Sequence, residues 1–135
     1  MAFLIHSTND GRVSPWEYLP AGAITPKAGM ALVLSSGKLA IATGTTKPTF
    51  ISMIEKDTAL TAGDEIPVIR ITPDMVLETK NSASFSGIKI GDMVTLHASD
   101  GMQVTATTTS GVAEVVGFDD NAASGAGGKV LVRFA

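Results

Sequence analysis

The sequence contains no cysteine. Disulfide bonds, thiolate metal sites and thiol catalysis are therefore excluded together, and the stability of the chain must come from packing or assembly. Long apolar runs are also missing. The apolar start, residues 1–5, ends at His6 and is too short for a signal peptide or a membrane span, so we expect no membrane partner and a product made in the cytoplasm.

Charge is sparse and mixed. Ten Lys and Arg and 13 Asp and Glu residues give a net charge of −3, and charged residues make up 17% of the chain. The basic residues are scattered singly, which excludes the continuous basic stripe that follows nucleic-acid phosphates. We therefore expect no nucleic-acid partner and a surface on which Ser, Thr and Ala can be buried against other subunits.

Aromatic residues are few, and the single Trp and single Tyr lie close together as Trp16 and Tyr18. They fall in residues 1–27, where Pro15, Pro20 and other Pro and Gly residues interrupt any strand or helix periodicity. This pattern predicts an extended N-terminal arm, followed by a β-rich domain over residues 28–135. Two interpretations of the aromatic pair remain open. Either the rings fold back onto their own domain, or they anchor the arm to a neighbour, for example as an added strand on a sheet edge.

From Gly29 onward, short apolar or alternating segments are separated by Gly, Pro, Asn, Asp and Ser turns. The strands expected from this pattern are residues 31–34, 38–43, 50–54, 66–71, 75–79, 93–98, 102–107, 112–118 and 129–134. Pro67 should confine its strand to a sheet edge, or it should lie at the start of that strand. Short helical turns are expected only in residues 56–62 and 119–126. About nine or ten short strands predict a small, single-domain, all-β barrel or sandwich with little or no helix.

Residues 28–54 and 90–118 resemble one another. With two extra residues in the second stretch, Gly29 matches Gly91, Gly37 matches Gly101, and Ile51 matches Val115. Alternating strands with glycine turns also resemble one another by chance. The sequence therefore leaves open whether the likeness is a duplication.

No segment carries a recognisable catalytic, cofactor or metal motif. His6 and His97 are the only histidines, and no Gly-x-Ser-x-Gly elbow accompanies them. Residues 119–121 lack EF-hand spacing, and residues 125–128 lack the Lys-Ser/Thr of a P-loop. We predict that the protein is not an enzyme and uses no cofactor.

Two isolated acidic residues, Glu78 and Glu114, fall in expected strands. A catalytic carboxylate pair requires a geometry that spacing alone does not supply. We expect both to lie on exposed faces or to pair with Lys38, Lys80 or Lys89.

One region resembles a known family. The run Leu-Val-Leu-Ser-Ser-Gly-Lys-Leu-Ala at residues 32–40, Gly-Thr-Thr at residues 44–46 and the apolar residues 51–54 are similar to the head-decoration, or capsid-cement, proteins of tailed bacteriophages of the lambda type. Residues 18–27 are similar to the lead-in of such proteins from phages of Gram-positive hosts. The resemblance covers about a third of the chain.

This resemblance implies a small β-tulip domain that forms a homotrimer on the exterior of the virion. Such trimers sit at threefold and quasi-threefold positions of the expanded head and reinforce it against internal DNA pressure, with the major capsid protein as partner. The family's N-terminal arm orders against the shell. The capsid-contact residues implied here are Phe3, Leu4, Ile5, Trp16, Tyr18, Leu19 and Pro20, with residues 20–26 as the joint to the trimer body.

Two other classes fit the same composition. One is a different structural β-module of a virion, such as a head-fibre base, a tail-tube protein or a receptor-binding domain. The other is a small β-barrel that binds a small molecule or glycan, which would require a ligand-sized apolar cavity.

Overall fold

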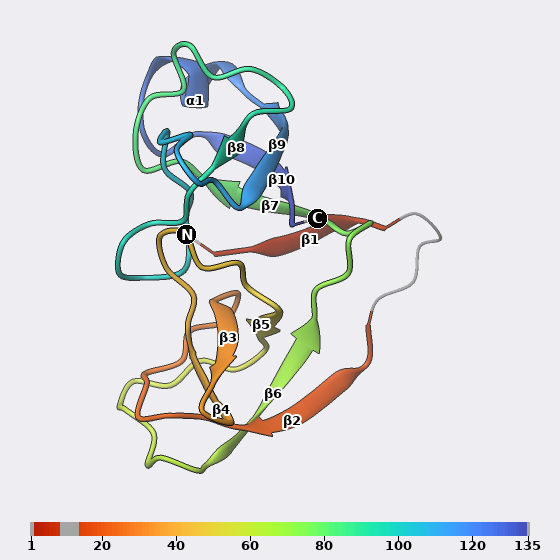
Figure 1. The fold of residues 1–135 in the computed structure, drawn as a ribbon, viewed down its shortest axis with the longest axis vertical. Helices are drawn as coiled ribbons and strands as arrows, with labels where there is room; N and C mark the ends of the chain where they lie inside the picture. The colour runs from red at the N-terminus through yellow and green to blue at the C-terminus, as the bar shows by residue number, and fades with distance from the viewer. Residues whose placement is uncertain (1, 9–13, 135) are drawn as a thin grey trace.

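The computed structural model describes residues 2–8 and 14–134. These residues form two five-stranded antiparallel sheets, one above the other in Figure 1. Sheet A contains, in spatial order, β1 (Leu4–Ser7), β7 (Val76–Lys80), β10 (Lys129–Arg133), β9 (Ala113–Phe118) and β8 (Met93–Val94). Sheet B contains β2 (Trp16–Pro20), β6 (Glu65–Arg70), β5 (Phe50–Ser52), β3 (Ala31–Ser35) and β4 (Lys38–Ile41). The prediction of a small all-β domain with little helix is confirmed, and the two sheets match a sandwich.

The one described helix, α1 (Asp120–Ser124), lies within a segment where a helical turn was expected. Its N-cap, Asp119, has extended backbone geometry and accepts a hydrogen bond from the Ala122 amide at 2.9 Å. That bond satisfies one of the amides that the first turn leaves unpaired. The expected strand at residues 102–107 is reduced to isolated bridges at Val104.

Residues 1–27 differ from the arm that the sequence analysis expects. Their described part is extended, but β1 pairs with β7 and β2 pairs with β6, so both segments are edge strands of the domain's own sheets. Phe3 is buried and meets Phe134 edge to face, with ring centroids 5.5 Å apart. No local sequence pattern predicts this pairing, because the partner strands lie about fifty to seventy residues further along the chain.

The edge position expected for Pro67 is wrong, because β6 is a central strand between β2 and β5, and Pro67 is the third residue of that strand. The carbonyl of Pro67 faces β5 and accepts the Met53 amide at 3.0 Å, just beyond the end of β5 at Ser52. The missing proline N–H therefore falls at the end of that ladder, where its loss removes little.

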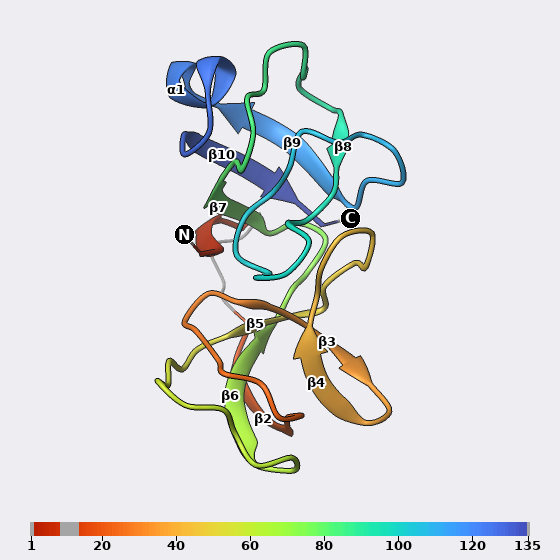
Figure 2. The same ribbon diagram turned by 90° about the vertical axis from the view of Figure 1, so that its left-hand side faces the viewer.

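The likeness between the two halves is a structural repeat that extends beyond the matched stretches. We define the first unit as residues 16–70 and the second unit as residues 76–133. The first unit is ordered β2–β6–β5–β3–β4. The second is ordered β7–β10–β9–β8 and continues through a bridge between Leu96 and Val104, while β1 is an addition to its edge. Figure 2 shows the two units one above the other.

Matching hydrogen bonds fix the correspondence between the units. The Gly29 amide donates to the Ser52 carbonyl at 2.8 Å, and the Gly91 amide donates to the Val115 carbonyl at 2.8 Å. Parallel bridges join Ala21 to Leu39 and Asn81 to Val104. The glycines therefore match as the sequence suggests, but Val115 corresponds to Ser52 and not to Ile51.

A long hairpin of the second unit joins the two units. Four residues separate the paired Leu34 and Leu39 in the first unit, whereas seven separate Leu96 and Val104 in the second. The longer loop reaches the first unit, where the Gly101 carbonyl accepts the Ala31 amide at 2.8 Å and the Leu96 amide donates to the Gly44 carbonyl at 2.9 Å. One buried cluster spans both units, and a second buried cluster forms the core of the first unit alone.

Gly101 allows this close approach, and its replacement tests the contact between the units. It has φ +63°, and a Cβ there would lie 2.7 Å from Ile41 Cγ2 and 3.1 Å from the Ala31 carbonyl oxygen. We expect Gly101→Ala to lower the free energy of unfolding by about 2–4 kcal/mol, from backbone strain plus the clash. Gly37→Ala is the matched control, because Gly37 has φ +78° in open space and should cost only about 1 kcal/mol. Equal losses in chemical denaturation would show that the hairpin contact contributes nothing.

Candidate interaction surface

Exposed large hydrophobic side chains mark the surfaces available to a partner. In residues 2–8 and 14–134 these are Leu4, Trp16, Tyr18, Leu34 and Ile90. Trp16 is 57% exposed and Tyr18 is 61% exposed, although both rings belong to residue types that usually bury most of their area. They are also the two residues that the sequence analysis singled out as anchors.

Strand register places both rings on one face of sheet B. Trp16 lies opposite Ile69, and Tyr18 lies opposite Pro67. Because directly opposed residues share a face, the rings continue the apolar surface of Ile69 and Ile51, which is buried in the cluster shared by the units. The aromatic pair is therefore the exposed end of an apolar surface whose other end is covered.

The strand that carries the rings is held firmly on its neighbour. Glu17, between the two aromatics, receives two hydrogen bonds from the Arg70 guanidinium at 3.0 and 3.2 Å. The same guanidinium lies 4.8 Å from the centre of the Phe50 ring. The Ser14 hydroxyl also donates to the Arg70 carbonyl at 2.8 Å. β2 is held mainly by its ladder with β6 from Trp16 to Pro20, and these surface contacts add to that pairing.

An apolar groove of about 320 Å³ lies beside this surface, between β1 and β5. Its lining residues are Phe3, Leu4, Ile5, Ala28, Gly29, Ile51, Ser52 and Met53. None of them carries a charge. Met53 lies on the same face of sheet B as Tyr18, with β6 between them, because its amide bonds to Pro67, the residue opposite Tyr18. No sequence pattern marks Ala28, Gly29 or residues 51–53 as part of a contact surface, since their role depends on the position of β1.

The seven residues expected to contact a capsid are divided by the fold. Trp16, Tyr18 and Leu4 are exposed, and Ile5 is half-buried in the wall of the groove. Phe3 is only 1% exposed, so its side chain belongs to the core of the chain itself. Leu19 and Pro20 are half-buried, and Leu19 packs against the core of the first unit.

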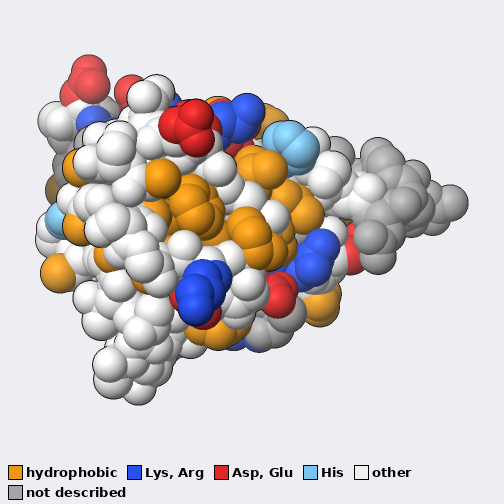
Figure 3. Space-filling model, turned by 90° about the horizontal axis from the view of Figure 1, so that it is seen from above, with side chains coloured by type: hydrophobic (Ala, Val, Ile, Leu, Met, Phe, Trp, Pro, Cys, Tyr) orange, Lys and Arg blue, Asp and Glu red, His pale blue; other side chains and the backbone are white. Residues whose placement is uncertain are grey.

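The end of the molecule that carries sheet A presents both apolar and charged side chains. Figure 3 looks down on the molecule from the side of sheet A and shows hydrophobic side chains near the centre with Lys, Arg, Asp and Glu around them. Glu78 pairs with Lys129 and Glu114 with Arg133, each at 3.7 Å. The expected lysine partners were therefore wrong, because the cross-strand neighbours on β10 lie closer. Exposed pairs of this kind contribute little stability.

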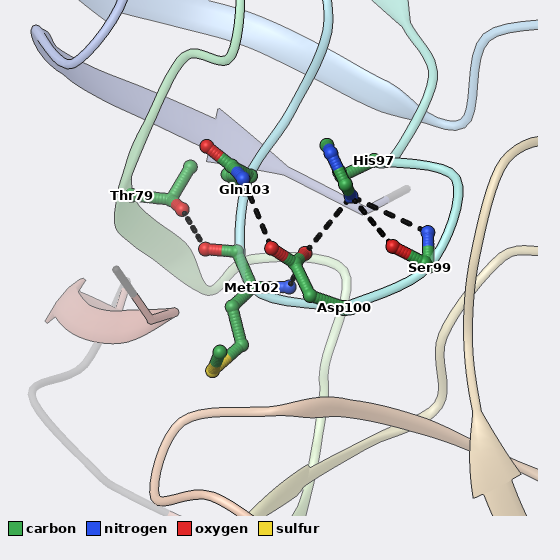
Figure 4. A network of polar contacts seen from close by, with 6 residues as sticks. All are labelled: Thr79, His97, Ser99, Asp100, Met102 and Gln103. Atoms are coloured by element: carbon green, nitrogen blue, oxygen red, sulfur yellow. Dashed lines mark hydrogen bonds and ion pairs between the residues drawn. The ribbon is translucent and has the colours of Figure 1, made fainter.

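One polar cluster resembles a catalytic triad in composition only. His97, Ser99 and Asp100 lie together at the tip of the long hairpin (Figure 4), but the Ser99 hydroxyl and the Asp100 carboxylate both approach Nδ1 of His97, each at 3.4 Å. A triad needs the nucleophile and the acid on opposite ring nitrogens. Asp100 instead accepts the Met102 amide and the Gln103 side chain, each at 2.9 Å, and so shapes the hairpin.

Within the described ranges, no group of three or more His, Cys, Asp or Glu side chains is placed to hold a metal ion. The described helix is too short to cross a membrane. No family model matches the chain, and searches of curated proteins and of solved structures found no significant match.

Proposed function

We propose that the protein is a decoration protein of a tailed-bacteriophage head. It binds the outside of the expanded shell as a homotrimer, at threefold and quasi-threefold positions, and reinforces the shell by adding contacts between capsid subunits. The observation that carries this proposal is the exposed pair Trp16 and Tyr18, fixed on an edge strand beside an uncharged groove. The resemblance of residues 32–54, which form β3, β4 and β5, supports the choice of family.

Binding through β2 differs in one respect from the arm that the resemblance implies. An arm that becomes ordered on binding loses conformational entropy at that step, whereas β2 is already held by β6. More of the gross interaction energy then remains as affinity. The proposed contact is thus a preformed surface.

Magnitudes explain why a trimer suits this surface. Covering the exposed part of both rings removes roughly 250 Å² of apolar area from water, a gross gain of about 6 kcal/mol. Association costs roughly 4–15 kcal/mol in lost translational and rotational freedom, so one copy of the surface binds weakly. Three linked copies share that cost, and the avidity of the trimer makes binding stable.

Sedimentation of the purified protein with expanded heads tests the proposal. The heads are assembled from the major capsid protein encoded in the same genome, and light scattering after size exclusion gives the oligomeric state. We expect trimers, in solution or on the shell, that sediment with expanded heads. A monomer that never binds them would contradict the proposal. Larger closed rings would indicate a tail-tube module instead.

A further inference from the structure

The groove between β1 and β5 presents backbone groups as well as apolar side chains. In residues 2–8 and 14–134, β1 pairs with β7 alone. The Phe3 amide points the other way and donates to the Gly29 carbonyl at 2.8 Å. Amides two residues apart on a strand point to the same side, so the N–H and C=O of Ile5 also face away from β7. No described residue outside the β7 ladder hydrogen-bonds to them.

The shape and chemistry of the groove restrict what can fill it. It is about three residues long on each wall, Phe3–Ile5 on one and Ile51–Met53 on the other, and no lining residue is charged. Gly29 lies between the two walls, where its carbonyl accepts the Phe3 amide and its amide donates to the Ser52 carbonyl, each at 2.8 Å, and a Cβ there would lie 2.6 Å from the Ala2 Cβ. Beyond Met53, the same face of sheet B continues through Pro67 to Tyr18. An occupant must therefore be narrow, uncharged and able to hydrogen-bond through its own backbone.

We propose that this groove binds an extended, uncharged segment of the major capsid protein, which adds to β1 as a further strand of sheet A. Its apolar side chains cover Ile5 and Met53, the half-buried residues of the two walls, and the residues that follow lie against Tyr18 and Trp16. This inference rests on the proposed function and specifies its partner surface. In the arrangement implied by the resemblance, the arm of the decoration protein orders against the shell. Here the decoration protein supplies the receiving edge.

Two features, one of β1 and one of the groove beside it, favour strand addition. The side of β1 that faces away from β7 has no described backbone partner at Ile5, and the register irregularity between Ile5 and Ser7 limits an added strand to a short segment. The groove beside it continues the apolar contact between the two units, since Ile51 belongs to the shared core and Met53 packs against it. A strand bound there would extend an interface that already exists within the chain. Recognition by main-chain bonds plus side-chain pockets is typical of strand addition.

Replacing Ile5 with proline removes the N–H that faces the groove without breaking the ladder to β7. Ile5→Ala is the matched control, because it shortens the side chain but keeps the N–H. Both variants should show similar melting temperatures. We expect Ile5→Pro to bind expanded heads at least tenfold more weakly than Ile5→Ala in the sedimentation assay.

A second pair of variants applies if Ile5→Pro does not fold. Met53→Lys places a charge in the groove, whereas Ile90→Lys places one at an exposed apolar position outside it. We expect at least a tenfold loss of head binding for Met53→Lys and little change for Ile90→Lys. If the wild-type protein binds heads but each variant binds as well as its control, the groove inference is wrong and the proposed function stands. If the wild-type protein does not bind heads, both are wrong.

Discussion

The double variant Trp16→Ala/Tyr18→Ala is expected to bind expanded heads about a thousandfold more weakly than the wild-type protein. Buried aromatic anchors contribute roughly 2 kcal/mol each when they are truncated, and the two together give about 4 kcal/mol. Because both rings are more than half exposed in the free chain, their removal should leave the melting temperature nearly unchanged. Titration of labelled protein onto heads, with thermal denaturation in parallel, measures both quantities.

Leu34→Ser and Ile90→Ser are the controls for this prediction. Leu34 is 45% exposed and Ile90 is 63% exposed, so each variant removes a comparable apolar side chain from the surface. Leu34 lies at the free hairpin between β3 and β4, and Ile90 precedes β8. Neither lies in the groove or on β2. If either control lost as much affinity as the double variant, the contact surface would have to be placed elsewhere.

The variant Asn81→Ala is expected to lower the free energy of unfolding by about 4 kcal/mol. Asn81 is 1% exposed, and its side-chain nitrogen lies 2.7–3.0 Å from the carbonyl oxygens of Ala83, Ala122 and Gly125. Its side-chain oxygen accepts the Gly128 amide at 2.8 Å. Truncation leaves several buried backbone groups unpaired, each costing about 1–3 kcal/mol less any relaxation. For a chain of this size the melting temperature should fall by roughly 10–15 °C.

Asn121→Ala is the control for Asn81. Asn121 is exposed within α1, and alanine has the higher helix propensity, so its replacement should change stability by less than about 0.5 kcal/mol. An Asn81→Ala variant as stable as Asn121→Ala would show that the loop over residues 119–128 is held by packing alone. The repeat makes the role of Asn81 plain, because Ala21 occupies the same position in the first unit and makes only the backbone contacts.

Local pattern predicted the elements of the fold well. The hairpin of β3 and β4 and the strands near residues 50, 66, 76, 113 and 129 lie where alternation and glycine turns indicate. The one-residue error between Ile51 and Ser52 has a physical cause. Sequence similarity does not report hydrogen-bond register, and a shift of one residue exchanges the two faces of a strand. Ile51 faces the second unit, whereas Ser52 faces the core of the first, so only the hydrogen bonds could settle the match.

The candidate surface could be predicted only in part. Trp16 and Tyr18 were identified because they are the only residues of their kind and lie in a stretch where Pro and Gly interrupt any strand or helix periodicity. The strand that holds them was missed, since Trp16 to Pro20 pairs with residues near 67 and no local signal reports such a partner. The groove was missed for the same reason. Ile5 and Met53 become neighbours only through the packing of sheet A on sheet B.

The most direct test of the account is a cryo-electron microscopy reconstruction of expanded heads incubated with the purified protein. We predict density for trimers at the threefold and quasi-threefold positions, with Trp16, Tyr18 and the groove between β1 and β5 against the shell and an extended capsid segment beside Ile5. Bare heads would contradict the proposed function. Trimers that turn β2 and the groove away from the shell would contradict the assigned surface.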